Sequence, residues 1–118
     1  MKRQTTSEFF EKLNNLENTI YAIDVTNKFE KSVKKSYARN LDLDVLLDVL
    51  HKLAKGEALD KKHRTHELKG NLVGIMECHV QPDWLLLWKQ DGEQLILLLL
   101  DLGTHSDLYG KNKKYKSL

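Results

Sequence analysis

The feature that most constrains the fold is the single proline, Pro82, which has strand-forming residues on both sides. A proline pre-sets its own φ for a turn and has no backbone N–H to donate to a sheet. We therefore expect the chain to reverse at residues 81–83, between a strand that ends near His79 and another over residues 84–89. His79 and Asp83 become near neighbours across such a turn.

Two further strands complete the predicted sheet. Asp91-Gly92 suits the positive φ angles of a hairpin turn, and residues 94–102 contain the run Leu-Ile-Leu-Leu-Leu-Leu. Because this run does not alternate between apolar and polar residues, we expect a central strand that is covered on both faces. Residues 19–25 form the other further strand and are rich in residues that favour strands, and the strand before Pro82 spans residues 71–80.

Helical periodicity marks the rest of the chain. Residues 1–18 predict a helical extension with Ser7 as its cap, and its apolar stripe consists of Phe9, Phe10, Leu13 and Leu16. A second helix opens with a capping-box pattern at Asn27 and Glu30. A third begins at Asp42 and ends at Gly56, and its apolar stripe consists of Leu43, Leu46, Leu47, Leu50 and Leu53.

The order of these elements predicts an α+β fold: a small antiparallel sheet of about four strands, arranged β-α-α-β-β-β, with two packed helices and the extra N-terminal helix. We divide the chain into the extension (1–18), the main domain (19–110) and a lysine-rich tail (111–118). The 118 residues fit one domain.

Composition excludes several classes of protein. One cysteine, Cys78, excludes an internal disulfide and favours a cytoplasmic protein in which Cys78 is a buried apolar residue. The longest apolar run, residues 95–100, is far shorter than the roughly 20 residues that cross a bilayer. No apolar core follows Met1-Lys-Arg, so we expect neither a signal peptide nor a membrane partner.

The predicted topology brings ionisable side chains to one end of the sheet. The third and fourth strands run antiparallel, so His105, after the fourth, returns to the start of the third beside His79 and Asp83. Tyr109 can reach the same place, whereas this argument does not place His66. Two imidazoles can act as general base and general acid near neutral pH, which is the chemistry needed to cleave RNA through its 2′-hydroxyl.

The cationic segments and the histidines leave alternatives open. RNA phosphates can bind the loop from Lys61 to Arg64 and the basic face of the second helix, formed by Lys28, Lys31, Lys34, Lys35 and Arg39. Lysines on one helix face are, however, usually just a solvated surface. A zinc site formed by His63, His66, His79 and His105 is a further hypothesis, although the compact ligand spacing of zinc motifs is missing.

Three motifs resemble those of the YafQ branch of the RelE-type toxins, the toxin halves of type II toxin–antitoxin pairs. They are His66-Glu-Leu-Lys-Gly70, Glu77-Cys-His-Val-Gln-Pro-Asp-Trp-Leu-Leu-Leu-Trp88 and Gly103-Thr-His-Ser-Asp-Leu-Tyr109. The resemblance covers about residues 19–110. It implies an endoribonuclease that enters the ribosomal A site and cuts translated mRNA without a cofactor or metal. It also implies a cognate antitoxin, with operator DNA bound only through the antitoxin complex.

The resemblance also implies the site. His105 is assigned as the general acid, His66 or Asp83 as the general base, and His79 as the residue that orients the phosphate or stabilises its charge. Tyr109 is expected to stack on a base. The family often carries an arginine where Asp101-Leu102 stands here, and an aromatic-arginine pair where Ile75-Met76 stands. Phosphate stabilisation is therefore expected from Lys69, Lys89 or the tail.

Those two departures leave a second hypothesis open. A toxin on the same fold can act without catalysis, by binding another target or only its antitoxin. The set of His66, His79, Asp83 and His105 favours the enzyme, whereas the missing arginine favours the binding protein.

Overall fold

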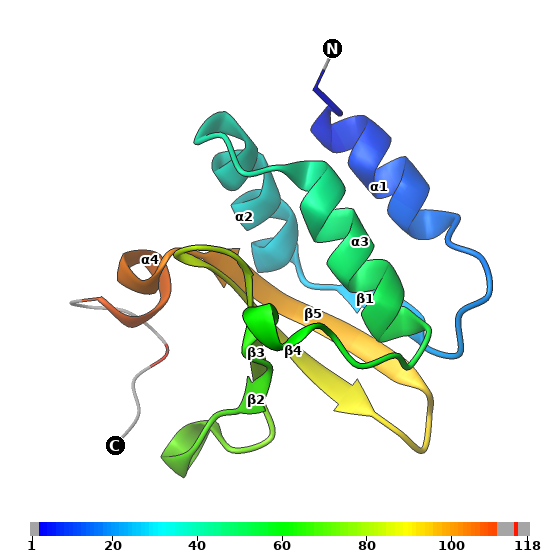
Figure 1. Ribbon diagram of the computed structural model, residues 1–118, viewed down its shortest axis with the longest axis vertical. Coiled ribbons are helices and arrows are strands. Elements are labelled where there is room, and N and C mark those ends of the chain that lie inside the picture. Colours follow the sequence, from blue (N-terminus) through cyan, green and yellow to red (C-terminus); the bar gives the residue numbers. More distant parts are fainter. Residues whose placement is uncertain (1–2, 111–114, 116–118) are drawn as a thin grey trace.

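In the computed structural model, residues 3–110 and Tyr115 are described, and they form a mixed sheet with α1, α2 and α3 grouped on one side (Figure 1). The helices are α1 (Thr6–Asn14), α2 (Asn27–Ala38), α3 (Leu43–Ala54) and α4 (His105–Tyr109). The strands are β1 (Ala22–Val25), β2 (His66–Glu67), β3 (Met76–Gln81), β4 (Trp84–Asp91) and β5 (Ile96–Gly103). This architecture confirms the predicted α+β class.

The sheet has the strand order β1-β5-β4-β3-β2. β1 pairs with β5 in parallel, and the other neighbours are antiparallel. β5 lies between β1 and β4, which confirms that the unbroken leucine run is an interior strand. The fifth strand, β2, has two residues and lies in the predicted polar loop, so the sheet exceeds the expected four strands by one.

The helix caps differ from the predictions by one or two residues. Thr5, not Ser7, caps α1, and it forms a capping box with Glu8. Thr26, not Asn27, caps α2, where its hydroxyl accepts the N–H of Phe29 at 2.9 Å. Ser, Thr and Asn are all preferred helix caps, with Thr slightly behind the other two, so the backbone path decides between neighbouring candidates. Asp42 caps α3 as predicted.

Two strand boundaries also differ. The predicted strand over residues 71–80 begins only at Met76, because residues 70–72 form a short 3-10 turn and Gly74 has a φ of +95°. The predicted strand over residues 19–25 begins at Ala22. The turn between β4 and β5 spans residues 92–95 rather than two residues, with the Asp91 carboxylate accepting the N–H of Glu93 and of Gln94.

The main core lies between the helices and one face of the sheet. Its fully buried side chains include Phe9 from α1, Phe29 from α2, Leu50 from α3 and Leu97 from β5. The predicted apolar stripes of the helices therefore do face the sheet. The segment just before α1 contacts α2, because the Arg3 guanidinium donates a hydrogen bond to the Tyr37 carbonyl at 2.9 Å.

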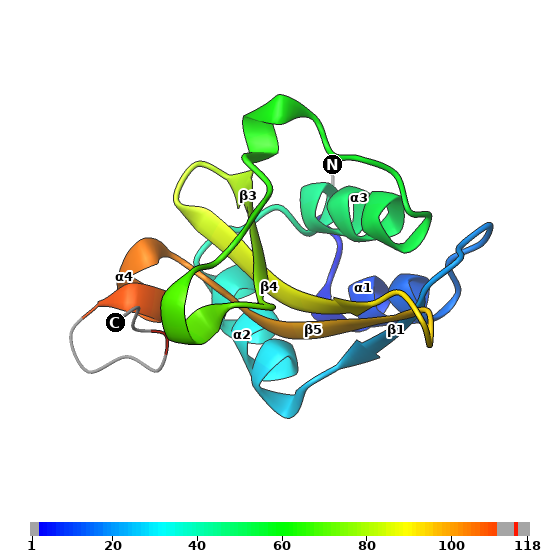
Figure 2. The same cartoon turned by 90° about the horizontal axis from the view of Figure 1, so that it is seen from below.

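A smaller apolar cluster covers the opposite face of the sheet. It contains Leu85, Leu87 and Leu108, with Tyr109 packed against them. In Figure 2, α4 and the segment before β3 lie at the same end of the molecule, away from β1. This end carries the candidate site. The predicted tail lies outside the described residues, except for Tyr115.

Within residues 3–110 and Tyr115, no helix has the length and apolar character needed to cross a membrane.

Candidate functional site

The Pro82 turn joins β3 to β4 as predicted, and it presents Asp83 to the start of α4. Asp83 has a φ of 61°, which turns the chain back directly into Trp84. Its carboxylate oxygen Oδ1 accepts the Nδ1–H of His105 at 2.6 Å and the backbone N–H of His105 at 3.1 Å. These hydrogen bonds from His105 lower the pKa of the Asp83 carboxyl below its usual range. They also fix the tautomer of His105, so that its Nε2 is the nitrogen available to a substrate.

His79 lies beside His105, as the antiparallel topology predicted. The two imidazole rings have centroids 5.6 Å apart and planes inclined at 64°. Burial is the main cause that lowers the pKa of His79. The Glu77 carboxylate opposes this shift, and the positive charges of His105, Arg64 and His66 reinforce it. His79 is therefore the imidazole that stays neutral at neutral pH.

His66, which sequence reasoning could not place, joins the site through β2. The short strand pairs His66 with Glu77 on β3, and His66 Nε2 lies 3.2 Å from Glu77 Oε1. Its other ring nitrogen, Nδ1, donates to the Arg64 carbonyl oxygen at 2.7 Å. Both ring nitrogens of His66 thus face oxygen atoms of the protein.

Glu77 is the residue that sequence reasoning missed. Its side chain is only 8% exposed, and its two oxygens contact two site residues: Oε1 faces His66, and Oε2 accepts a short hydrogen bond from the Tyr109 hydroxyl. Burial and this hydrogen bond raise the pKa of Tyr109, which keeps the phenol protonated. The available signal was the position of Glu77 inside a predicted strand, because a carboxylate that becomes buried there needs partners.

Tyr109 and Lys69 lie close to His66, as a substrate-binding role requires. They line a cavity of about 310 Å³ together with His66, Leu68 and Leu72. Lys89 does not lie there. It is on the far half of β4, where it lines a separate hollow near the β4–β5 turn, apart from His66, His79 and His105. The reason is the distance along β4. Each residue of a strand advances the chain by about 3.3 Å, so Lys89 lies well away from the end of β4 that follows the Pro82 turn.

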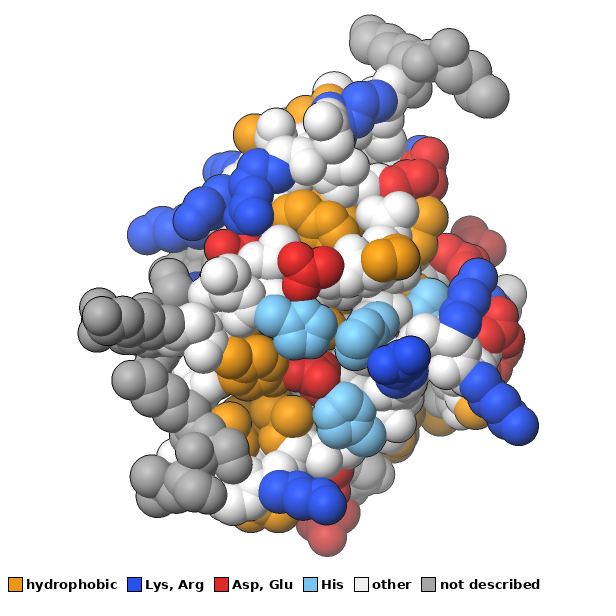
Figure 3. Space-filling view, turned by 60° about the vertical axis from the view of Figure 1, so that its left-hand side comes forward, with side chains coloured by type: hydrophobic (Ala, Val, Ile, Leu, Met, Phe, Trp, Pro, Cys, Tyr) orange, Lys and Arg blue, Asp and Glu red, His pale blue; other side chains and the backbone are white. Residues whose placement is uncertain are grey.

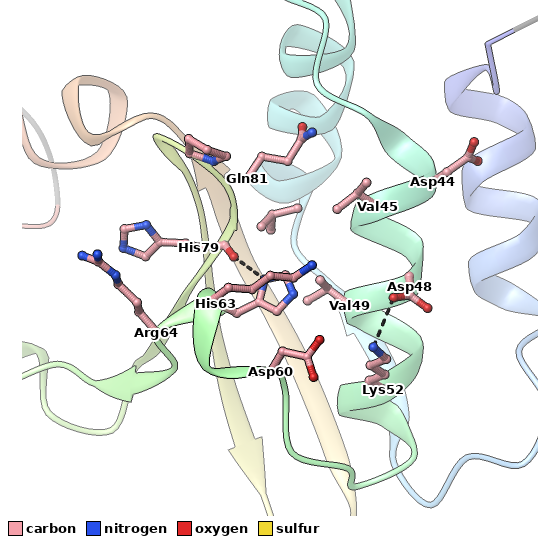
Figure 4. A pocket seen from close by; sticks show the side chains of 13 residues that line it. Asp44, Val45, Asp48, Val49, Lys52, Asp60, His63, Arg64, His79 and Gln81 are labelled. Atoms are coloured by element: carbon pink, nitrogen blue, oxygen red, sulfur yellow. Dashed lines mark hydrogen bonds and ion pairs between the residues drawn. The ribbon is translucent and has the colours of Figure 1, made fainter.

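The loop before β2 brings Arg64, the last residue of the predicted cationic loop, to the site. His63 is buried, and its Nδ1 donates to the His79 carbonyl oxygen at 2.5 Å. In Figure 4 the Arg64 side chain points toward the His79 ring, and both residues line a cavity of about 760 Å³ with His63. The cationic loop that sequence analysis linked to RNA phosphates therefore reaches the site.

Asp101, at the place where the family resemblance implies an arginine, is buried and paired. It accepts the Ser32 hydroxyl at 2.7 Å and lies 3.1 Å from Lys28 Nζ. Lys28 is thereby engaged with the sheet, whereas Lys31, Lys34 and Lys35 on the basic face of α2 are exposed. Cys78 is fully buried, as predicted, and burial raises the pKa of its thiol to about 12.

The hypothesis of a zinc site has no geometric support in the part of the chain that the structure describes, where no three His, Cys, Asp or Glu side chains are grouped as metal ligands. His63 is turned away from the others, toward the His79 carbonyl. Figure 3 shows histidine side chains gathered on one face with acidic, basic and apolar groups around them. From the contacts above, this histidine cluster consists of His66, His79 and His105.

Comparison with known proteins identifies relatives of the whole main domain. Residues 21–110 match the family model described as bacterial toxin of type II toxin-antitoxin system, YafQ. The mRNA interferase toxin YafQ of Escherichia coli K12 is 29% identical over 89 residues, which cover 75% of this chain and 95% of that protein.

Solved structures of toxins also match the main domain. A metal-bound toxin from Helicobacter pylori is 36% identical, with a TM-score of 0.69 over 73% of this chain and 96% of that one. The YafQ chain of the E. coli DinJ–YafQ complex is 28% identical, with a TM-score of 0.70 over 76% of this chain and 99% of that one. The match to the family model begins after α1, so the N-terminal helix lies outside it.

Proposed function

Because the chain belongs to the YafQ family of toxins of bacterial type II toxin–antitoxin systems, we propose that it is an mRNA interferase, an endoribonuclease that cuts mRNA and so inhibits translation. The observation that carries the proposal is the pair of imidazoles, His79 and His105. Their ring centroids lie 5.6 Å apart, and Asp83 is hydrogen-bonded to His105. A base and an acid at this separation can flank one phosphodiester.

The reaction uses the substrate's own 2′-hydroxyl. A base removes the 2′-hydroxyl proton, and the oxygen attacks the adjacent phosphorus to form a new P–O bond. The bond from phosphorus to the 5′-oxygen then breaks, and His105 Nε2–H gives its proton to that leaving oxygen. The products are a 2′,3′-cyclic phosphate and a 5′-hydroxyl, and each acid or base contributes on the order of 10²–10⁴-fold to the rate.

The surroundings of each candidate favour His79 as the base, rather than the His66 or Asp83 expected from sequence. His66 has both ring nitrogens directed at protein acceptors. Asp83 has a lowered pKa because His105 donates to it, which makes its carboxylate a weak base. His79 has a lowered pKa that keeps its imidazole neutral, so a ring nitrogen can accept the proton of the 2′-hydroxyl.

The remaining residues bind and position. Tyr109 stacks on a base with the part of its ring that is not packed on the sheet, and Lys69 neutralises a phosphate near the same cavity. Asp83 orients His105. Glu77 holds His66 and Tyr109 in place.

The partners follow from the family. The E. coli relative forms a complex with DinJ, its antitoxin, and we propose that this chain likewise has a cognate antitoxin through which alone it reaches operator DNA. Its substrate is mRNA in the ribosomal A site, which places its action in the cytoplasm.

The test is primer extension on a reporter mRNA after induction of the wild type, His79→Gln and His105→Gln. His51→Gln is a matched control, since His51 lies on α3 and contacts the Glu17 carbonyl, remote from the site. We expect cuts confined to translated codons in the wild type and the control, and none in the two site variants. Growth arrest without cuts would indicate the non-catalytic toxin instead.

A further inference from the structure

The loop before β2 fixes the backbone of Arg64 from both sides. The turn at Lys61–His63 ends at Arg64, which adopts the left-handed conformation with a φ of 48°. On one side, buried His63 ties the loop to the His79 carbonyl at 2.5 Å. On the other, the Arg64 carbonyl accepts His66 Nδ1–H at 2.7 Å. The backbone of Arg64 is therefore fixed next to His66 by one contact and next to His79 by the other.

The Arg64 side chain is directed at the site and is not engaged by an acid. It shares the cavity with His79, toward which it points in Figure 4. Within residues 3–110 and Tyr115, Arg64 forms no ion pair. Two other cations near this end of the sheet do: Arg39 lies 2.8 Å from Asp107, and Lys28 lies 3.1 Å from Asp101.

In the transition state of cleavage through the 2′-hydroxyl, extra negative charge develops on the two non-bridging oxygens of the phosphate. A neutral His79 cannot neutralise that charge, and His66 faces the Glu77 carboxylate at 3.2 Å. A guanidinium is planar, permanently charged and matched to two phosphate oxygens at once. The reaction thus needs a cation beside His79, and among the described residues Arg64 is a cation without an ion pair whose side chain points toward that ring.

We propose that the Arg64 guanidinium binds the non-bridging oxygens of the scissile phosphate and stabilises their charge in the transition state. Arg64 is then a catalytic residue of the loop before β2, not of β5, whose corresponding position is the buried Asp101. This inference rests on the proposed endonuclease function, and it names the group that supplies phosphate stabilisation there.

The left-handed backbone provides a clean variant. Glycine adopts a positive φ without steric cost, so Arg64→Gly removes the guanidinium and keeps the carbonyl that orients His66. Arg64→Lys keeps the charge without the fork. Lys12→Gln, on the exposed side of α1, loses one positive charge far from the site and serves as the control.

The experiment measures single-turnover cleavage of mRNA on programmed ribosomes by the purified proteins. We expect Arg64→Gly to lose about 10²–10³-fold in rate, as when one transition-state donor is removed, with Arg64→Lys between it and the wild type. Binding to ribosomes carrying an uncleavable 2′-deoxy mRNA should weaken less than tenfold. Added guanidinium ion should restore part of the rate to Arg64→Gly and leave His105→Gln unchanged.

Two results would overturn the inference about Arg64 alone: cleavage by Arg64→Gly within about threefold of the wild type, well short of the loss of one such donor, or a loss that guanidinium does not relieve and that accompanies a lower melting temperature. Failure of the wild type itself to cut mRNA in the same assay would overturn the proposed function and this inference together.

Discussion

Replacing Tyr109 with phenylalanine tests whether the buried Glu77 depends on the phenol. Tyr109→Phe keeps the ring but removes the hydroxyl that donates to Glu77, whose side chain is 8% exposed. A hydrogen bond to a charged group contributes about 1.5–3 kcal/mol. We therefore expect urea denaturation to show a free energy of unfolding lower by that amount. At about 4 °C per kcal/mol for a domain of this size, the melting temperature falls by roughly 6–12 °C.

Tyr21→Phe is the matched control. The Tyr21 hydroxyl accepts an exposed hydrogen bond from Gln90 at 2.8 Å, so its loss should cost less than about 1 kcal/mol. Equal destabilisation by the two variants would refute the argument that the charge of Glu77 strengthens its bond to Tyr109. Because the ring remains, Tyr109→Phe should also keep its affinity for RNA, whereas Tyr109→Leu should lose the stacking contribution of about 1–3 kcal/mol per base.

Three further predictions concern single groups of the site and core. Asp83→Asn should slow single-turnover cleavage by about 10–10²-fold without weakening RNA binding, because it releases the tautomer of His105 but leaves the acid in place, whose own loss costs about 10²–10⁴-fold. His79, whose pKa is lowered by burial, should titrate by NMR with a midpoint below its ordinary value of about 6.5. Since the unfolded chain binds that proton first, His79 should make the protein less stable as the pH falls below about 6.5, and not above it. Cys78, with a pKa raised to about 12, should react with a thiol reagent at neutral pH only in denaturant.

Sequence patterns predicted the parts of the site that depend on long elements. Pro82 located the turn, and the antiparallel order of β3, β4 and β5 was sufficient to bring His79, Asp83 and His105 together. The apolar stripes likewise identified the helix faces that form the core. These inferences succeed because each rests on a repeated pattern or on strand direction.

The other half of the site depends on an element too short to show any pattern. β2 has two residues, and only its pairing with Glu77 places His66. Arg64 itself adopts the left-handed conformation although it is not glycine, and the sequence offers no signal for that conformation. The parallel pairing of β1 with β5 also escaped prediction, since it joins segments that are remote in sequence and separated by two helices.

That parallel pairing has a consequence for how the protein is made. β1 and the Thr26 cap of α2 find their partners on β5, and the hydroxyl of Thr26 donates to a carbonyl 74 residues further along the chain. Closing so long a loop is slow, and strands synthesised early wait for those that come late. The sheet therefore cannot close, nor His105 meet Asp83, while β5 is still within the ribosome. The pairing of His105 with Asp83 is therefore completed only after the last strand of the sheet has been synthesised.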